Sequence, residues 1–222
     1  MPRPHTASIT DRLRLNLIRL LLKFYVMFHW EKISFRRLNL NVPNGCFPPK
    51  YTVSTSLLAS LLEQDEHFET VNVALEIGCG VGVLTLIVAR RGIYTIGVDI
   101  SEDCIASAVR NSRENLLDTL TDFVVCESGK CIRDNSIDIC FTNPPYLPIT
   151  PKDIIDYSFA GGDSLEILLD ILENCKRITK KDGCILLAIN DIALKSLKLE
   201  KFKKAAYHKS LFDTVYVLKK RG

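Results

Sequence analysis

The sequence lacks the paired ligands of a metal site. No two of its eight cysteines stand in a C-x2-C arrangement, and its four histidines are scattered along the chain. Structural zinc sites usually draw their ligands from such close pairs. We therefore expect no bound metal and no metal-dependent catalysis. The residues concerned are Cys46, Cys79, Cys104, Cys126, Cys131, Cys140, Cys175 and Cys184, and His5, His29, His67 and His208.

The chain also lacks an unbroken apolar run of the roughly 18–20 residues that a membrane span requires. Residues 13–28 come closest, but basic residues interrupt them. Arg12, Asn16, Arg19 and Lys23 recur at helical spacing and form one narrow polar stripe on an otherwise apolar helix. We expect no integral membrane segment and a helix that packs on the domain or on a partner. A helix lying on a membrane surface is the alternative.

A secretory signal, an internal repeat and a low-complexity linker are not recognisable either. Cys140 and Cys184 fall in apolar, strand-like runs, where a free thiol acts as a small hydrophobic group. We therefore expect reduced cysteines and a cytoplasmic location. At 222 residues, the chain is long enough for one well-buried core with a small appendage.

Charge is unevenly distributed along the chain. Residues 1–50 hold nine Lys/Arg against two Asp/Glu, residues 51–194 hold eleven against twenty-two, and residues 195–222 hold nine against two. Two basic ends therefore flank an acidic middle. Basic ends favour a polyanion such as RNA as a partner, or they simply form a solvated surface.

From about residue 71 onward, strand-like and helix-like segments alternate. This alternation predicts a mostly parallel sheet that is covered by helices on both faces. Ser101 stands where it can cap the second helix, and Lys180-Lys-Asp-Gly183 is expected to end the third. The expected strands are 71–77, 94–99, 122–126, 137–142, 184–189, 205–209 and 214–218, and the expected helices are 81–91, 102–115, 164–178 and 192–199.

A glycine motif, Val73-Ala-Leu-Glu76-Ile-Gly78-Cys-Gly80-Val-Gly82, lies where the first strand turns into a helix. Strand-to-helix turns of α/β sheets bind nucleotides, and glycines let the backbone approach the ligand closely. Its G-x-G-x-G spacing differs from the G-x-G-x-x-G of pyrophosphate sites. Glu76 suits the ammonium group of an amino acid, and Asp99, 23 residues on, suits ribose hydroxyls.

A second motif, Asn143-Pro144-Pro145-Tyr146, follows the fourth strand. An amide or adenine nitrogen is a poor nucleophile because its lone pair is delocalised. The Asn143 side-chain oxygen and the Pro144 carbonyl could accept both N–H bonds and so redirect the lone pair, with the prolines holding these acceptors in place. Tyr146 would stack on the flat group. The motif predicts methylation of a planar nitrogen without a strong base.

With these residues the chain resembles the class I S-adenosylmethionine-dependent methyltransferases, and among them the HemK-like group. The similarity extends over residues 45–220 and includes Ala160-Gly-Gly-Asp-Ser-Leu165. It implies a Rossmann-like, doubly wound α/β fold with a mostly parallel seven-stranded sheet over 46–222. Residues 1–45 would form a short basic and apolar helical extension. The cofactor implied is S-adenosyl-L-methionine, contacted by Glu76, Gly78, Gly80, Gly82, Asp99, Ile100, Glu127 and Asn143.

Members of this group typically methylate the glutamine of the Gly-Gly-Gln loop in peptide release factors. A length of 222 residues resembles the short archaeal and eukaryotic form, which implies a small zinc-binding activator subunit as a partner. Asn143, Pro144, Pro145 and Tyr146 would bind the substrate, with Asn143, Pro144 and Tyr146 as catalytic residues. One segment departs from the group. Residues 46–58 keep an aromatic residue, a proline and a Thr-x-Leu-Leu, but they lack its acidic residue.

Two other functions stay open at this point. Adenine-N6 methyltransferases of DNA, rRNA and tRNA share the Asn-Pro-Pro-Tyr motif, because adenine offers the same planar amino group, and the basic ends favour nucleic acid. A methyltransferase fold that only binds, without catalysis, is the third reading, since fold does not fix function.

Overall fold

The computed structural model describes residues 9–28, 31–65, 68, 70–197, 199, 201–209 and 214–221. Its helices are α1 (Ile9–Phe28), α2 (Val53–Gln64), α3 (Val83–Ala89), α4 (Glu102–Glu114), α5 (Glu166–Ile178) and α6 (Asp191–Ser196). Its strands are β1 (Glu31–Phe35), β2 (Leu38–Val42), β3 (Val73–Ile77), β4 (Tyr94–Asp99), β5 (Thr121–Val125), β6 (Ile137–Thr142), β7 (Thr179–Asn190), β8 (Lys203–Lys209) and β9 (Thr214–Arg221). Short 3₁₀ turns lie at Pro49–Tyr51 and Asp156–Ser158.

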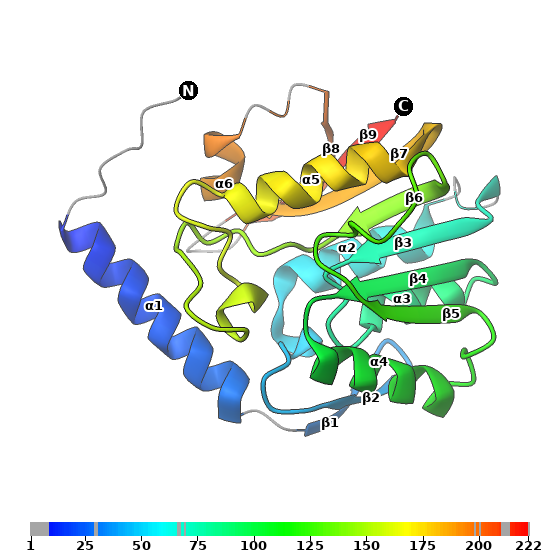
Figure 1. Ribbon diagram of the computed structural model, residues 1–222, viewed down its shortest axis with the longest axis horizontal. Coiled ribbons are helices and arrows are strands. Elements are labelled where there is room, and N and C mark those ends of the chain that lie inside the picture. Colours follow the sequence, from blue (N-terminus) through cyan, green and yellow to red (C-terminus); the bar gives the residue numbers. More distant parts are fainter. Residues whose placement is uncertain are drawn as a thin grey trace.

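Seven strands form one sheet in the order β5-β4-β3-β6-β7-β9-β8 (Figure 1). Neighbouring strands from β5 to β7 are parallel, whereas β9 runs antiparallel to both β7 and β8. The chain winds outward from β3 to β5 and then returns to the other side of β3 with β6. This reversal leaves a crevice at the carboxyl ends of β3, β4 and β6, where open α/β sheets bind ligands. The predicted Rossmann-like, mostly parallel seven-stranded fold is confirmed.

Helices cover both faces of the sheet. One hydrophobic cluster joins α2 and α3 to one face through side chains such as Leu58, Leu84 and Phe141. On the other face, α5 and α6 pack through Leu168, Leu172 and Ala193. Leu58, Phe141, Leu168 and Ala193 have no exposed surface. This two-sided burial explains why β3 and β6 are mostly apolar and do not alternate strictly between apolar and polar residues.

The predicted elements agree with the observed ones at most positions. The bounds of β4 and β6 are those expected, and Ser101 caps α4 by accepting a hydrogen bond from the Cys104 N–H. Helix α5 ends at Ile178 as expected, but β7 begins already at Thr179 and not at residue 184. The pairing of β6 with β7 shifts register between Ile137 and Ile139 there, so the turn-like residues occupy an irregularity within the strand.

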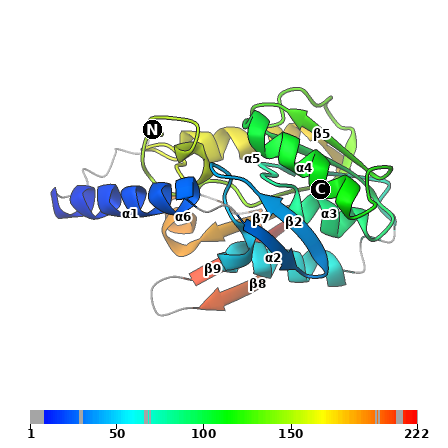
Figure 2. The same cartoon turned by 90° about the horizontal axis from the view of Figure 1, so that it is seen from below.

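The N-terminal region contains more than the expected helix. After α1, strands β1 and β2 form an antiparallel hairpin that the sequence had not predicted. The hairpin is fixed to α4, since the Asn111 side chain accepts a hydrogen bond from the Asn41 N–H at 2.7 Å and donates one to the Asn41 carbonyl at 3.1 Å. Helix α1 lies at one side of the molecule, next to the segment between β6 and α5 (Figures 1 and 2). A domain boundary at residues 45/46 stays a prediction.

Four cysteines differ from the expectation. Disulfides join Cys46 to Cys104 and Cys126 to Cys131, so the prediction of reduced thiols is wrong for these pairs. Cys79, Cys140, Cys175 and Cys184 are buried and form no disulfide, as expected for small apolar side chains. The disulfides remove the support that reduced cysteines gave to a cytoplasmic location, which stays a prediction. None of the helices in the described ranges is long and apolar enough to cross a bilayer.

Candidate active site

A cavity of about 520 Å³ lies at the carboxyl ends of β3, β4, β5 and β6. This volume is within the range of roughly 300–1,000 Å³ that is typical of small-molecule sites. Every site residue predicted from the sequence lines it except Gly82. The two motifs are therefore brought together although they are 61 residues apart, counted from Gly82 to Asn143. Within the described ranges, no group of three or more His, Cys, Asp or Glu side chains is arranged to hold a metal ion.

The glycine turn is held against the neighbouring strand. The Gly78 and Cys79 N–H groups both donate to the Val98 carbonyl, at 2.8 and 3.0 Å. Gly78 and Gly80 adopt positive φ angles of 75° and 52°, and a Cβ added at either would meet no atom within 4 Å. These two glycines therefore give a ligand direct access to the backbone. Gly82 serves packing instead, because a Cβ there would approach the Phe123 ring to 2.9 Å and keep α3 from its close contact.

Glu76 is buried at the end of β3, with 2% of its surface exposed. Its Oε2 atom accepts hydrogen bonds from the N–H and the hydroxyl of Thr85, at 2.7 and 2.5 Å, which fixes the carboxyl group beside the first turn of α3. Burial raises the pKa of Glu76 to about 8, and the nearby Asp99 carboxylate adds to this rise. A cation that enters the cavity would lower this pKa, so the Glu76 carboxyl group would lose its proton and become negatively charged.

Asp99, at the end of β4, connects the turn to this strand. Its Oδ2 accepts a hydrogen bond from the Gly80 N–H at 2.8 Å, and its Oδ1 accepts one from the Ser101 N–H at 2.9 Å. Burial raises the pKa of Asp99, and these backbone hydrogen bonds oppose that rise. Each carboxylate oxygen has a second lone pair, so Asp99 can also accept from a ligand.

The segment after β5 closes the far end of the cavity. Glu127 pairs with Lys130 at 3.0 Å, and Lys130 also pairs with Asp170 of α5 at 3.3 Å. Cys126, next to Glu127, is bonded to Cys131. These contacts fix the loop that presents Glu127, while Ile100 lines the same end of the cavity and is 37% exposed.

Asn143 stands at the end of β6 with its amide in a defined orientation. Its Nδ2 group donates to the Thr55 hydroxyl at 3.0 Å. Its Oδ1 atom is buried and has no hydrogen-bond partner among the described residues. Because buried polar atoms are normally hydrogen-bonded, an unpaired acceptor on a residue that lines a cavity is a candidate partner for a ligand donor. Pro144, Pro145 and Tyr146 line the cavity beside it.

The Ala160–Leu165 segment packs closely against the Asn143–Tyr146 turn. The Gly161 N–H donates to the Leu147 carbonyl at 2.8 Å. A Cβ at Gly161 would lie 2.9 Å from the Pro145 carbonyl oxygen. A side chain at this position would therefore displace the turn, which explains the glycine.

Sequence reasoning missed several residues of the cavity wall. Thr55 comes from α2, Ile18 and Leu22 come from α1, and Phe47 and Tyr157 come from loops. These residues stand in none of the motifs, and only the Thr-x-Leu-Leu that begins at Thr55 gave a signal for α2.

Comparison with known proteins gives a family match over most of the chain. A family model described as the methyltransferase small domain matches residues 44–210. The match includes the glycine turn, Asp99 and the Asn143–Tyr146 turn.

Curated relatives are more distant. Ribosomal protein L11 methyltransferase of Campylobacter fetus is 28% identical over 94 residues, which are 42% of this chain and 34% of that protein. Release factor glutamine methyltransferase of Fusobacterium nucleatum is 26% identical over 125 residues, which are 55% of this chain and 34% of that protein. The matched part of the chain thus spans about one third of the length of these relatives.

Solved structures share the fold over almost the whole chain. The human methyltransferase 10 domain containing protein superposes with a TM-score of 0.60 and 18% identity, covering 97% of this chain and 99% of that one. At this identity, the similarity supports the fold alone.

Proposed function

Since the chain belongs to the methyltransferase small domain family and is thereby an S-adenosylmethionine-dependent methyltransferase, we propose that it methylates the nitrogen of a planar amide or amino group. We further propose that residues 46–222 form the catalytic domain and residues 1–45 an extension. The first candidate substrate is a glutamine side chain of a peptide release factor.

The residues of the cavity fit S-adenosylmethionine. Gly78 and Gly80 leave the backbone open to it, Glu76 would receive its ammonium group, and Asp99 would receive its ribose hydroxyls. Ile100 and Glu127 would contact its nucleoside end. When bound, this cofactor supplies an electrophilic methyl group on a positively charged sulfur.

The observation that carries the proposal is the acceptor of Asn143. The Thr55 hydroxyl holds the amide nitrogen, whereas the buried Oδ1 atom of this cavity-lining residue has no partner among the described residues. An N–H donor of the substrate would satisfy it. An oxygen or carbon nucleophile without a hydrogen to donate would leave it unpaired, at a cost of about 1–3 kcal/mol.

This acceptor also explains how a poor nucleophile could react. A substrate N–H that is held by Asn143 Oδ1, with the second one held by the Pro144 carbonyl, directs the nitrogen lone pair out of the amide plane. The acceptors are in place before the substrate binds, so little reorganisation is needed. Tyr146 would position the flat group by stacking. No general base is required, because the nitrogen can release its proton after methylation.

The names of two curated relatives support a protein substrate, since one methylates ribosomal protein L11 and another a release factor glutamine. Two further relatives are named for ubiquinone biosynthesis and for 23S rRNA. The small zinc-binding activator subunit belongs to the same proposal. Purification of the tagged chain from its own cells, followed by zinc analysis, tests for it.

An adenine in RNA is the second candidate, and the edge of the sheet favours it. Strand β8 exposes Lys203, Lys204 and Lys209 around Tyr207, whose exposed fraction is 67%. Lys204 also lies over the Tyr216 ring, 4.3 Å from its centroid. Basic residues interleaved with aromatic rings suit single-stranded nucleic acid.

The deciding experiment is transfer of a tritiated methyl group from labelled cofactor to release factor, rRNA and tRNA in parallel. Incorporation into release factor that disappears when the loop glutamine is replaced would support the first candidate, and incorporation into RNA the second. A chain that binds the cofactor but labels none of them would favour a binding subunit without catalysis.

A second experiment tests the proposed cofactor site. Asp99→Ala should weaken cofactor binding in calorimetry by about one to two orders of magnitude, since a charged acceptor is worth about 1.5–3 kcal/mol.

A further inference from the structure

Helix α1 exposes a continuous apolar stripe. Its members recur at spacings of three and four residues, so they lie on one side of the helix. Their exposed fractions range from 39% for Met27 to 68% for Phe28, and the Phe24 and Phe28 rings contact each other with centroids 4.6 Å apart. We call these six residues the outer stripe: Leu17, Leu20, Leu21, Phe24, Met27 and Phe28.

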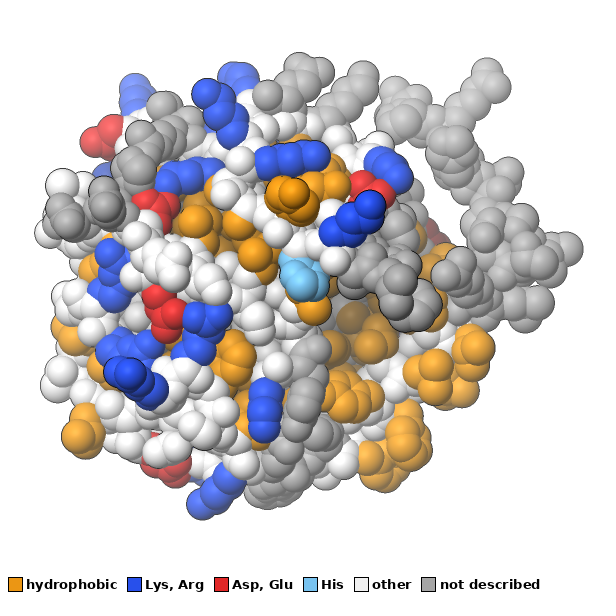
Figure 3. All heavy atoms as spheres, turned by 180° about the vertical axis from the view of Figure 1, so that it is seen from behind, with side chains coloured by type: hydrophobic (Ala, Val, Ile, Leu, Met, Phe, Trp, Pro, Cys, Tyr) orange, Lys and Arg blue, Asp and Glu red, His pale blue; other side chains and the backbone are white. Residues whose placement is uncertain are grey.

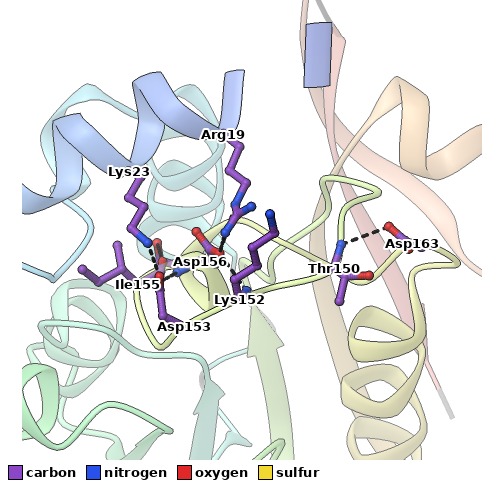
Figure 4. Close-up of polar contacts among 9 residues, drawn as sticks. Arg19, Lys23, Thr150, Lys152, Asp153, Ile155, Asp156 and Asp163 are labelled. Carbon is purple, nitrogen blue, oxygen red and sulfur yellow. Dashed lines mark hydrogen bonds and ion pairs between the residues drawn. The ribbon is translucent and has the colours of Figure 1, made fainter. Parts of the chain in front are cut away.

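The orientation of α1 is fixed by its opposite side. Arg19 and Lys23 point toward the loop between β6 and α5, where they form ion pairs with Asp156 and Asp153 (Figure 4). Leu22 packs beside Phe159 and Ala160, and Val26 has no exposed surface. The polar stripe expected from the sequence thus faces the protein through Arg19 and Lys23, while the side chain of Arg12 lies outside the described residues. The outer stripe faces away because the inner side is already occupied.

The area of the outer stripe exceeds what isolated surface residues explain. Six large side chains exposed to this degree present roughly 600–800 Å² of apolar surface, whereas the largest patch on a typical monomer is about 300–600 Å² and often functional. From behind, hydrophobic side chains gather at the side of the molecule where α1 lies (Figure 3). An apolar patch of this size indicates that the outer stripe binds another molecule or a membrane.

Charge distinguishes between the occupants. The sequence of α1 holds four basic residues and one acidic residue, and residues 1–50 hold nine against two. Arg19 and Lys23 are neutralised by their ion pairs on the inner side, so Arg12 and Arg14 carry the excess positive charge of the helix. In a symmetric pair of copies, the same basic segment would meet itself, which is unfavourable. An anionic lipid surface matches both features, since it takes up the apolar stripe and attracts the basic segment. With 20 residues, α1 is about 30 Å long and can lie in the plane of the interface.

We propose that the outer stripe of α1 docks the enzyme on an anionic membrane surface. Because Ile18 and Leu22 on the other side of α1 line the cavity, docking would place the cavity entrance close to the lipid headgroups. This inference does not depend on which nitrogen is methylated.

Cosedimentation of the full chain with lipid vesicles tests the proposal. The vesicles consist of phosphatidylcholine alone or with one third phosphatidylglycerol. We expect binding to the anionic vesicles that weakens with salt, because the electrostatic part is screened. Replacing Leu20 and Phe24 together by serine should lower the partition coefficient about tenfold or more, since two exposed apolar side chains would no longer be transferred from water into the lipid interface. The matched control, Leu169→Ser, removes a 47% exposed leucine from α5 and should bind like wild type.

Two results would overturn the proposal. In one, the wild-type chain does not bind anionic vesicles at low salt, or it binds both vesicle types equally. In the other, the Leu20→Ser/Phe24→Ser variant binds as well as wild type. Light scattering identifies the competing occupant: a wild-type dimer that the double variant converts to monomer, without vesicle binding, would indicate a second copy. Unchanged melting temperature and cofactor affinity of the double variant would show that it folds normally.

Discussion

At the scale of single residues, Asn143 separates catalysis from cofactor binding. Its Oδ1 atom lacks a partner, whereas most of the proposed cofactor contacts, among them those of Glu76 and Asp99, are made by other residues. Asn143→Ala should therefore lower kcat by about 10²–10³, the effect of removing one pre-aligned acceptor worth about 2.7–4 kcal/mol. Calorimetry should give nearly unchanged affinity for S-adenosylmethionine, and single-turnover methyl transfer measures the loss of kcat.

The Asn143→Asp variant keeps an accepting oxygen and should retain more activity than Asn143→Ala, with an altered pH profile. Wild-type rates in Asn143→Ala would mean that the turn is only structural.

Thr55 acts on the reaction through Asn143. Its hydroxyl accepts the Nδ2 hydrogen bond at 3.0 Å, and its own exposed fraction is 5%. Thr55→Val removes this acceptor at nearly constant volume, so the amide loses its fixed orientation. We expect kcat to fall about tenfold, since the lost hydrogen bond is worth about 1–3 kcal/mol.

The conservative variant Thr55→Ser supplies the control for that prediction. It keeps the hydroxyl and should restore kcat, while a purely structural role of Thr55 would lower the melting temperature of both variants without separating their kcat values. Equal kcat in Thr55→Val and wild type would remove Thr55 from the positioning role.

At the scale of elements, one buried ion pair attaches α1 to the rest of the chain. Asp156 is fully buried and accepts hydrogen bonds from Arg19 Nε at 3.0 Å and from the Lys152 N–H at 2.8 Å. Removing one partner leaves a buried charge uncompensated, so Arg19→Leu should lower the free energy of unfolding by about 3–5 kcal/mol.

A double-mutant cycle tests whether this loss comes from the pair. Arg19→Leu together with Asp156→Leu removes both charges and should be less destabilising than the sum of the single variants by about 1 kcal/mol or more, as urea unfolding would measure. Strictly additive losses would show that Arg19 and Asp156 do not stabilise α1 through each other.

The elements that the sequence failed to predict have specific physical causes. The β1–β2 hairpin turns at Arg36 and Arg37, which both adopt positive φ angles, 49° and 65°. Two-residue hairpin loops usually have glycine or asparagine at these positive-φ positions. Because arginine is not typical of such a turn, no signal in the sequence indicated the hairpin. Helix α2 begins with Ser54, Thr55 and Ser56, residue types that favour caps and turns. Its stability comes from buried Leu58 and Leu62, which no local pattern reveals.

The site was predictable where it depends on linear motifs. The ends of β3, β4 and β6 could be found from apolar runs that stop at Gly78, Asp99 and Asn143, and parallel strands bring such ends to one edge. Contacts between distant segments were not predictable. Thr55 and Asn143 are 88 residues apart, and the pairing of Cys46 with Cys104 depends on the hairpin that was missed.

At the scale of the whole molecule, the two disulfides should contribute unequally to stability. The Cys46–Cys104 bond closes 58 residues and the Cys126–Cys131 bond closes five. The loss of chain entropy in the unfolded state predicts a contribution of about 4 kcal/mol for the first and about 2 kcal/mol for the second. Cys46→Ala/Cys104→Ala should therefore lower the melting temperature more than Cys126→Ala/Cys131→Ala. If a reductant changes the melting temperature of neither the wild type nor the variants, the cysteines are not bonded in solution.

The stability of the cofactor-free protein should fall as pH rises through the neutral range. Glu76 has an ordinary pKa of 4.5 and a folded pKa of about 8, because burial disfavours its charge, and burial shifts Asp99 in the same direction. A raised pKa means that the folded state binds more protons, so this stability is fully present below about pH 4.5 and is lost as pH approaches 8. The loss due to Glu76 can reach about 1.4 kcal/mol per pH unit between those values. Burial opposes the lowering of the Asp138 pKa, but its hydrogen bonds with Lys180 and with the backbone lower it below 3.8. The contribution of Asp138 to stability therefore changes only below about pH 3.8, outside the pH range in which Glu76 acts.

S-adenosylmethionine should reverse this trend, because its ammonium group favours the charged form of Glu76. Thermal unfolding from about pH 5.5 to 8.5 should show a decreasing melting temperature without cofactor and a larger stabilisation by cofactor at the alkaline end. Binding at about pH 7 should release protons, which calorimetry detects as a dependence of the binding enthalpy on buffer. Glu76→Gln cannot ionise, so it should flatten the pH dependence of the free protein and abolish the proton release. A Glu76→Gln variant that keeps the wild-type pH profile and proton release would exclude Glu76 as the group that receives the ammonium.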